Sequence, residues 1–313
     1  MSLAGRSQPA SRSDRLLQQA RKATKQSEEI GTQTVGRVEG KVAFITGAAR
    51  GQGRSHAIFL AREGARIVAT DVGGGQLEHV EYPTASEDDL QETVRLVREA
   101  GGEIVAGYAD VRDREAIDAV VAQGFEAFGF IDVVVANAGV FTWGAAPNLS
   151  RESWQTVIDI NLNGTWNAVQ SVLPSMVARG KGGSIMMTAS QIATRGQSNA
   201  VGYAASKAGI VGMMRALAAE LARDNIRVNT IHPSTVYTEM ILNEPVYKVF
   251  RPDLENPGLA EMEAELRPFH MLDVPALEVE DISHAVVYLA SEESRYVTSM
   301  KFAIDAGSTQ KLG

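Results

Sequence analysis

Short runs of consecutive apolar residues alternate with longer helix-like stretches along the chain from Lys41 onward. The runs are rich in β-branched residues and are apolar throughout, which is typical of strands that are buried on both faces of a sheet. The pattern therefore predicts seven strands, at residues 42–46 (VAFIT), 66–70 (RIVAT), 103–108 (EIVAGY), 131–137 (IDVVVAN), 184–188 (SIMMT), 226–231 (IRVNTI) and 301–305 (KFAID).

Helical segments between the predicted strands provide the crossovers of a parallel sheet. We therefore expect a doubly wound α/β Rossmann fold, with a seven-stranded, mostly parallel sheet and helices on both faces. Composition does not change again after residue 40 and no repeat is present, so residues 39–313 are predicted to form a single catalytic domain. Two connections, 72–88 and 238–274, are longer than ordinary loops and are candidates for function.

Residues 1–38 form a basic N-terminal extension that is rich in Ser, Gln and Arg. A helix is possible over Asp14–Glu29, but its apolar face consists only of two leucines and two alanines, so we expect a mobile arm or a helix that docks on a neighbouring subunit. A basic, acid-poor start is also found in organelle transit peptides, whereas a secretory signal would need an apolar core that this segment lacks.

Composition and charge exclude several classes of function. Cysteine is absent from the 313 residues, which excludes disulfides, thiol nucleophiles and cysteine-based metal sites and suits a cytoplasmic protein. The net charge of −8 and the lack of a basic stripe argue against nucleic acid as a partner. No apolar run approaches the roughly 20 residues that span a membrane. The five histidines are not spaced as metal ligands, so no metal site is expected.

A glycine-rich turn follows the first predicted strand and precedes a helix-like segment, RSHAIFLAREG. Glycines in this position allow a tight turn whose N–H groups approach a pyrophosphate at the helix N-terminus. The turn is therefore a candidate nucleotide site, with Gly47, Arg50, Gly51, Gln52 and Gly53.

Asp71 ends the second predicted strand, 18 residues after Gly53. Its carboxylate can bind the two ribose hydroxyls of adenosine and would repel a 2′-phosphate, so NAD is favoured over NADP as the cofactor. Arg50 is the opposing signal, because its guanidinium could meet a 2′-phosphate or could simply lie on the surface.

Two further segments follow predicted strands at the same edge of the sheet. Asp110 and Val111 are placed to contact the adenine ring, although Asp110 could instead cap a helix. Asn137, Ala138 and Gly139 would bring the chain close to the nicotinamide ribose, although they could form an ordinary turn.

Four polar residues form the candidate catalytic set. Tyr203 and Lys207 lie four residues apart in YAASK, so both can point from one helical face into a cleft. Ser190 follows the fifth strand 13 residues before Tyr203, and Asn161 lies in DINLNG. A nearby ammonium and a positive nicotinamide ring would lower the pKa of a tyrosine and favour the phenolate. Taken singly, each of the four has an ordinary structural role as the alternative.

These residues resemble the short-chain dehydrogenase/reductase family. The resemblance rests on T-G-x-x-x-G-x-G at 46–53, N-A-G at 137–139, Asn161, Ser190 and Y-x-x-x-K at 203–207, and it covers about residues 38–310. Three segments, GKVAFITGAARGQGRSHA, VEYPTASEDDLQETVRLV and YKVFRPDLENP, are similar to the carveol dehydrogenase group, which is described as mycofactocin-coupled.

The resemblance implies a mechanism. The alcohol oxygen lies between the hydroxyls of Ser190 and Tyr203, and the phenolate takes its proton while a hydride moves to the nicotinamide. Lys207 holds the ribose hydroxyls and lowers the pKa of the tyrosine, and Asn161 positions a proton-relay water. The segment after the sixth strand holds the carboxamide of the nicotinamide through Pro233, Val236 and Thr238.

This chain departs from the family pattern at two places. It has Ala136-Asn137 where the family often has two asparagines, and Pro233-Ser234 where the family often has Pro-Gly. Neither departure changes a catalytic residue, but the second bears on how the backbone near Val236 and Thr238 holds the carboxamide.

The substrate pocket should be lined by segments that follow the strands. These are Phe141 and Trp143, residues 191–194, and the apolar excursion 238–274, which we interpret as a substrate lid or alternatively as core or subunit contact. The lid candidates are Met240, Ile241, Leu242, Val246, Tyr247, Val249, Phe250, Phe269, Met271 and Leu272. A neutral apolar secondary alcohol or ketone, such as a terpenoid, is the predicted substrate, although Arg195 could favour an acidic one.

The insertion 72–88 is predicted either to cover the adenosine side of the cofactor or to be a surface loop. In the resembling group the NAD is thought to stay bound and to be reoxidised in place by a redox partner. A freely exchanging NAD(P)H ketoreductase of the same family is the main alternative, and a silent nucleotide-sensing protein is a lesser one. The family also implies a homotetramer, for which small residues at Gly202, Ala204, Ala205, Ala208 and Gly209 would allow close helix approach or, alternatively, would serve packing on the sheet.

Overall fold

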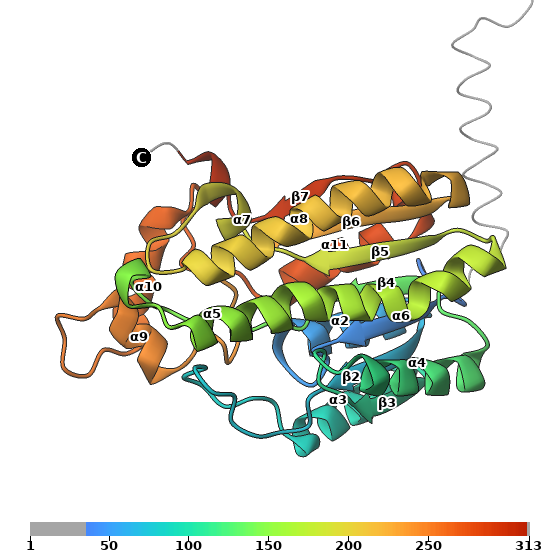
Figure 1. Ribbon diagram of the computed structural model, residues 1–313, viewed down its shortest axis with the longest axis horizontal. Coiled ribbons are helices and arrows are strands. Elements are labelled where there is room, and N and C mark those ends of the chain that lie inside the picture. The colour runs from blue at the N-terminus through green and yellow to red at the C-terminus, as the bar shows by residue number, and fades with distance from the viewer. Residues whose placement is uncertain (1–35, 312–313) are drawn as a thin grey trace, which may run out of the picture. The chain divides into compact units, whose positions relative to one another are not determined.

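The computed structural model describes residues 36–311, and these residues are built on one seven-stranded sheet (Figure 1). All six strand pairings are parallel, and the strand order is β3-β2-β1-β4-β5-β6-β7. The strands are β1 (Val42–Thr46), β2 (Arg66–Asp71), β3 (Ile104–Tyr108), β4 (Val133–Ala136), β5 (Gly183–Thr188), β6 (Ile226–Pro233) and β7 (Lys301–Ile304). The predicted strands and the doubly wound Rossmann fold are confirmed, with strand ends within two residues of those expected.

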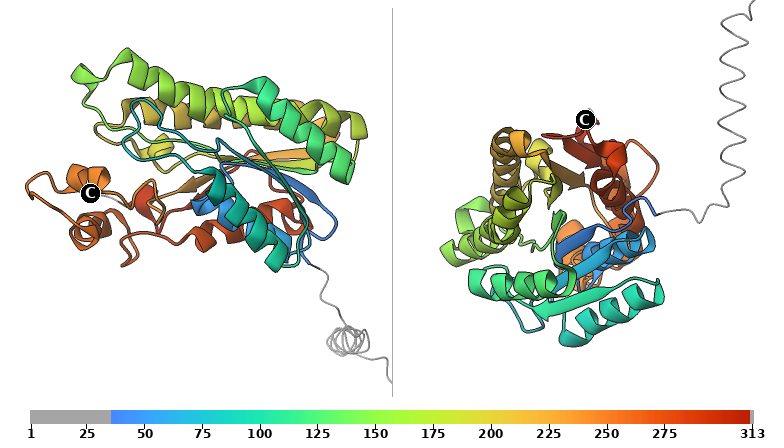
Figure 2. Two further views of the ribbon diagram at one scale, coloured as in Figure 1. Left: turned by 90° about the horizontal axis from the view of Figure 1, so that it is seen from below. Right: turned by 90° about the vertical axis from the view of Figure 1, so that its right-hand side faces the viewer.

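Helices cover both faces of the sheet (Figure 2). On one face lie α4 (Arg114–Phe128), α6 (Gly164–Arg179) and α8 (Val201–Leu221), whose apolar residues join one core cluster with β1, β4 and β5. On the other face lie α2 (Gly51–Arg62), α3 (Glu87–Glu99) and α11 (Val279–Ala290), which share a second cluster. Every residue of β1 and β4 is buried, because helices cover both faces of the sheet at these central strands. Strands in such a place need continuous apolar runs instead of alternating ones.

Residues between strands and helices set where the helices begin. Ser86 caps α3 by accepting the N–H of Asp89 at 3.2 Å, and the Asp89 carboxylate accepts the N–H of Ser86 at 2.8 Å. Asp113 caps α4 by accepting the N–H of Ala116 at 3.1 Å. Such caps satisfy N–H groups that the first helical turn cannot bond, and they fix where the preceding loop leaves the sheet edge.

The excursion between β6 and α11 contains α9 (Glu244–Phe250) and α10 (Leu259–Leu266). Val246, Met262 and Leu266 form a small core of their own beneath these helices. Short helices α5 (Arg151–Val157) and α7 (Ile192–Arg195) complete the same end of the sheet, and a π-helical turn, Ile158–Asn163, joins α5 to α6.

The predicted helix at 14–29 and the remainder of the basic extension up to residue 35 lie outside the described residues. The described chain begins with a turn in which Val38 is buried and Arg37 forms an ion pair with Glu293 at 2.7 Å. Within residues 36–311, no helix is long and apolar enough to cross a membrane. The same range contains no group of His, Cys, Asp and Glu side chains arranged to hold a metal ion.

Candidate functional site

A deep pocket opens along the carboxyl ends of β1, β2, β4, β5 and β6, where open α/β sheets bind ligands. Its walls include almost every residue that the sequence singles out. Ser190 and fifteen predicted cofactor residues line it: Gly47, Arg50, Gly51, Gln52, Asp71, Asp110, Val111, Asn137, Ala138, Gly139, Tyr203, Lys207, Pro233, Val236 and Thr238. Gly53 and Asn161 are the two predicted site residues that do not line it.

The glycine turn leaves space and N–H groups for a phosphate. Gly47 has φ of +66°, and a Cβ there would come within 2.8 Å of Ala138 Cα. Helix α2 begins after Arg50 without a side-chain cap, so its first N–H groups are available to an anion. Gly53 serves packing instead, because a Cβ on it would come within 1.9 Å of the Gly47 carbonyl oxygen. The turn therefore fits a pyrophosphate.

Asp71 lies in the pocket wall at the end of β2. Its carboxylate accepts the N–H of Ala49 at 2.9 Å and that of Val72 at 2.8 Å, which fixes its orientation at the end of β2. Burial raises the pKa of Asp71, and these two backbone donors partly oppose the rise. Each carboxylate oxygen keeps a lone pair for a ribose hydroxyl.

Arg50 is held by the insertion between β2 and α3. Its guanidinium donates a hydrogen bond to the Pro83 carbonyl at 2.5 Å. A 2′-phosphate would have to compete with this bond, so the observed position of Arg50 weakens the sequence signal for NADP.

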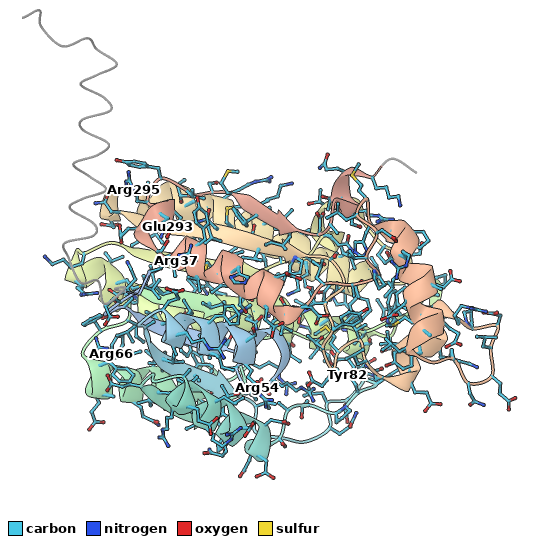
Figure 3. The ribbon with its side chains drawn as sticks, turned by 180° about the vertical axis from the view of Figure 1, so that it is seen from behind. Arg37, Arg54, Arg66, Tyr82, Glu293 and Arg295 are labelled. Atoms are coloured by element: carbon cyan, nitrogen blue, oxygen red, sulfur yellow. The ribbon has the colours of Figure 1, made fainter. Side chains whose placement is uncertain are left out.

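Tyr82, in the same insertion, lies buried in the pocket wall (Figure 3). Its hydroxyl oxygen accepts the N–H of Phe141, from the loop after β4, at 3.0 Å. Leu77, Thr84 and Ala85 also line the pocket. The insertion is therefore a wall of the site and is fastened at two points, by Arg50 and by Phe141.

Residues after β3 and β4 shape the middle of the pocket. Asp110 forms an ion pair with Arg112 at 2.6 Å, whereas the cap of α4 is Asp113. The capping role considered for Asp110 is therefore wrong. Asn137 donates from Nδ2 to the carbonyls of Thr46 and Gly47 at 3.2 and 3.3 Å, so it ties β4 to the glycine turn.

The hydroxyl of Ser190, the phenol of Tyr203 and the ammonium of Lys207 meet in the pocket. Ser190 and Tyr203 line the same part of the pocket, where the Ser190 side chain acts to lower the pKa of the Tyr203 phenol. Lys207 Nζ lies 5.6 Å from the centre of the Tyr203 ring and donates to the Thr188 carbonyl at 2.6 Å. His232, whose Nδ1 donates to the Ser190 carbonyl at 2.9 Å, holds the serine backbone in place. Such a group can hold an oxygen atom and exchange a proton with it.

Burial changes the pKa values of Tyr203 and Lys207. It raises the pKa of Tyr203 above its usual value of 10, and the Ser190 side chain only partly opposes it. Burial also lowers the pKa of Lys207 to about 7. Burial in the protein therefore favours the phenol form of Tyr203, whereas the expected shift toward the phenolate depends on the Lys207 ammonium together with a positive nicotinamide ring.

Asn161 lies behind the pocket wall and is fully buried in the π-helical turn. Its Oδ1 accepts the N–H of Val140 at 2.8 Å, and its Nδ2 donates to the Val140 carbonyl at 2.9 Å and to Ser206 Oγ at 3.2 Å. π-helical turns are rare and frequent at functional sites. Here the side chain secures the loop after β4 and has no free polar atom directed at the pocket.

Aromatic rings form the wall beside Tyr203. The Phe141 ring packs against Tyr203 at 4.5 Å and against Trp143 at 4.4 Å, and Trp143 meets Phe250 of α9 at 6.0 Å. The excursion also contributes Met240, Ile241, Leu266 and Phe269. Of the proposed lid residues, Leu242, Met271 and Leu272 are instead exposed.

The sequence reasoning missed two residues of this site. Tyr82 is a single aromatic in an irregular segment, so no periodicity marks it. His232 is a polar residue in a buried strand that ends at the ligand-binding edge, and that position could have indicated a role. Arg195 was considered for an acidic substrate, but its guanidinium donates to Ser308 Oγ at 2.9 Å and lies over Phe269.

Comparison with known proteins gives consistent matches over most of the chain. A sequence profile of the short chain dehydrogenase family matches residues 41–245. A putative short-chain type dehydrogenase/reductase from Mycolicibacterium smegmatis is 48% identical over 277 residues, covering 88% of this chain and 99% of that protein. A (-)-trans-carveol dehydrogenase from Rhodococcus erythropolis is 43% identical over 279 residues, with the same coverage.

Solved structures agree with the sequence relatives. The crystal structure of carveol dehydrogenase from Mycobacterium avium in complex with NAD superposes with a TM-score of 0.87 at 46% identity, covering 88% of this chain and all of that one. A short chain dehydrogenase from Mycobacterium paratuberculosis bound to NAD gives a TM-score of 0.81 at 44% identity, covering 88% of this chain and 100% of that one.

Proposed function

The chain belongs to the short-chain dehydrogenase family, and from this membership we propose that it is an NAD-dependent oxidoreductase that interconverts a hydrophobic secondary alcohol and its ketone. The observation that carries the proposal is the meeting of Ser190, Tyr203 and Lys207 in one pocket beside the glycine turn. A proton-exchanging phenol next to a nucleotide cradle is the arrangement that alcohol oxidation needs.

NAD is the proposed cofactor, and solved relatives at 46% and 44% identity hold it. The glycine turn would hold its pyrophosphate, and Asp71 its adenosine ribose. Asp110 and Val111 would contact the adenine, while Asn137 to Gly139, Pro233, Val236 and Thr238 would surround the nicotinamide end. The Asp71 carboxylate, which would repel a 2′-phosphate, supports NAD over NADP.

The chain's own residues would manage the proton of the alcohol. NAD, when bound, supplies a hydride acceptor for the carbinol carbon. Ser190 Oγ and Tyr203 Oη hold the alcohol oxygen, and Tyr203 as phenolate removes its proton. Since burial alone keeps Tyr203 protonated, the Lys207 ammonium must lie close enough in the loaded site to lower the tyrosine pKa. In the reverse direction Tyr203 returns the proton to the ketone oxygen.

Asn161 takes part as a positioning residue in this proposal. Its amide bonds are satisfied by Val140 and Ser206, so it fixes the loop that carries Phe141. The expected role of positioning a proton-relay water stays part of the proposal beside this indirect role.

The proposed substrate is a small alcohol with a largely apolar body, resembling carveol. The supports are the aromatic wall, the apolar residues of the excursion and a relative that is described as a (-)-trans-carveol dehydrogenase. Arg195 also lines the pocket, where it donates to Ser308 Oγ and lies over the Phe269 ring, so the preference for a neutral substrate rests on the aromatic and apolar walls. The excursion acts as a cover that excludes water from the reacting atoms.

Tight retention of NAD is a further part of the proposal. The insertion is fastened to the pocket by the bonds Arg50–Pro83 and Tyr82–Phe141, so a bound dinucleotide would have to break them or pass them to leave. A retained cofactor needs reoxidation in place, which makes a mycofactocin-like redox partner part of the hypothesis. A homotetramer in the cytoplasm is the expected form, but Gly202 and Gly209 already pack on Trp154 and Leu162 of the same chain.

The test combines cofactor identification with turnover. Purified protein is heat-denatured, and the released nucleotide is identified by chromatography. Carveol and other apolar secondary alcohols are then offered with an artificial electron acceptor or with free NAD. We expect NAD in the released fraction and turnover with the acceptor. An empty protein that turns over only with free NAD would overturn retention, and a protein that oxidises none of the alcohols would overturn the function.

A further inference from the structure

Three buried polar atoms on the pocket wall have no hydrogen-bond partner within residues 36–311: Gln52 Oε1, Trp143 Nε1 and Gln191 Oε1. Gln52 lies in the glycine turn, on the side that we assign to the nucleotide. Trp143 and Gln191 lie on the substrate side, after β4 and next to Ser190. Leaving a buried donor or acceptor unpaired is costly, so each of these atoms calls for a partner on a ligand.

The unpaired atom of Trp143 specifies what kind of hydrogen-bond partner it needs, whereas the unpaired atom of Gln191 does not. A glutamine amide can rotate to present either its oxygen or its nitrogen, so its unpaired atom does not distinguish donor from acceptor. An indole N–H only donates. The group that completes Trp143 must therefore be a hydrogen-bond acceptor.

The indole is fixed in place before any ligand arrives. Its ring packs edge-to-face on Phe141 at 4.4 Å and on Phe250 at 6.0 Å. The segment that carries it is held on both sides, by the Phe141 N–H to Tyr82 and by the Gly144 N–H to the Asn199 carbonyl at 2.9 Å. A donor that is fixed by packing is suited to select among substrates.

The position of the indole relates it to the proposed chemistry. The Phe141 ring contacts Tyr203 on one side and Trp143 on the other, at centroid distances of 4.5 and 4.4 Å. The indole is therefore separated from the proposed acid/base tyrosine by one aromatic ring. The indole lies between the rings of Phe141 and Phe250, and such apolar surroundings favour a neutral acceptor over a carboxylate.

We propose that the substrate is a cyclic secondary alcohol with a second, neutral oxygen remote from the carbinol, and that this oxygen accepts a hydrogen bond from Trp143 Nε1. The second oxygen is that of a ketone, an ether or a hydroxyl. The inference rests on the proposed alcohol oxidation and extends it, because a hydrocarbon alcohol such as carveol, although turned over, would leave the indole N–H unpaired and would be the poorer substrate.

The test uses two alcohols of nearly the same shape, 4-methoxycyclohexanol and 4-ethylcyclohexanol, which differ in the ether oxygen. We expect kcat/KM to be about tenfold higher for the methoxy compound in the natural protein. In Trp143→Phe, which keeps an aromatic ring but lacks the N–H, the preference should fall to about onefold. Trp154→Phe on α5, outside the pocket wall, is the matched control and should keep it.

Calorimetric dissociation constants of the two corresponding ketones on the NADH-loaded protein give a second readout. The same tenfold preference should appear in binding and should disappear in Trp143→Phe. Equal affinities in the natural protein, or a preference that survives in Trp143→Phe, would overturn the inference. Because equal affinities in the natural protein overturn the inference by themselves, the test remains decisive even if Trp143→Phe fails to fold. If neither alcohol is oxidised, the proposed function fails, and the binding ratio still decides the role of Trp143.

Discussion

The hydroxyl oxygen of Tyr82 accepts the backbone N–H of Phe141 at 3.0 Å, across 59 residues of sequence. The bond joins the insertion between β2 and α3 to the loop whose phenylalanine packs on Tyr203. A segment that could have been a surface loop is thereby connected to the proposed catalytic tyrosine through a single intermediate residue.

Tyr82→Phe should release this connection while keeping the ring. Because the Phe141 N–H would be left buried and unpaired, we expect a loss of about 1–2 kcal/mol in the free energy of unfolding. Bound NAD should leave several times faster, because one of the two fastenings of the insertion is gone. Urea unfolding and the rate of exchange with labelled NAD measure these effects.

Tyr108→Phe is the matched control for Tyr82. Tyr108 contacts the start of the insertion at Gly73, but it is partly exposed and its hydroxyl is bonded to Gln91. The two variants should therefore differ in NAD exchange. Equal exchange rates for both would contradict a special role of the Tyr82–Phe141 bond.

Asp71→Asn should weaken the proposed discrimination against NADP. The variant loses the negative charge that repels a 2′-phosphate and the charge-assisted bonds to the ribose hydroxyls. We expect NAD affinity to fall by about 10- to 100-fold and the preference for NAD over NADP to shrink. Dissociation constants of both nucleotides test this, with the exposed Asp118→Asn on α4 as control. An unchanged preference would show that another group selects the cofactor.

Asn161→Ala separates a positioning role from a direct one. The substitution leaves both backbone groups of Val140 and the hydroxyl of Ser206 without their partner, so we expect a loss of about 2–4 kcal/mol in the free energy of unfolding. Asn163→Ala on the same turn, where the side chain is exposed and bonds to Asp159, should cost much less. Chemical unfolding curves give both values, and an Asn161→Ala protein as stable as the parent would refute the positioning role.

Two buried histidines predict destabilisation in mild acid. Burial lowers the pKa of His56 to about 3 and that of His232 to about 4, below their usual 6.5. As the pH falls below about 6.5, these histidines bind protons in the unfolded chain but stay neutral in the folded protein. Their contribution to the free energy of unfolding is therefore fully present above that pH and is lost progressively below it.

Urea unfolding at several pH values measures the size of this loss. We expect about 2 kcal/mol per histidine by about pH 5, where most carboxylates are still ionised. His56→Gln and His232→Gln should flatten the pH dependence, whereas His79→Asn, exposed on the insertion, should not. A free energy of unfolding that is flat across this range would contradict the burial of these two groups.

The sequence predicted the sheet and most of the pocket because both depend on local patterns. Continuous apolar runs marked β1 to β7, and residues directly after strands necessarily share one edge of a parallel sheet, which placed Asp71 and Ser190 correctly. The contacts that the sequence could not give are those between distant irregular segments, such as Tyr82 with Phe141 and Arg50 with Pro83. No periodicity encodes such pairs.

The directions in which the pKa values of Tyr203 and Lys207 shift could not be predicted from the sequence either. The Y-x-x-x-K spacing puts Tyr203 and Lys207 on one helical face, but it does not report how far each is desolvated. In the structure, burial raises the pKa of the phenol and lowers that of the ammonium. Likewise, nothing in DINLNG predicted a π-helical turn that directs Asn161 away from the pocket and onto Val140.

In the proposed reaction Tyr203 exchanges the proton of a secondary alcohol while NAD accepts its hydride. Single-turnover mixing of the NAD-loaded protein with carveol, followed by the near-ultraviolet absorbance of NADH, tests it most directly. We expect NADH to form in the parent and to form at least about 100 times more slowly in Tyr203→Phe, which keeps the ring but loses the acid/base. NADH formation at the parental rate in Tyr203→Phe, with the protein folded and NAD bound, would contradict the account.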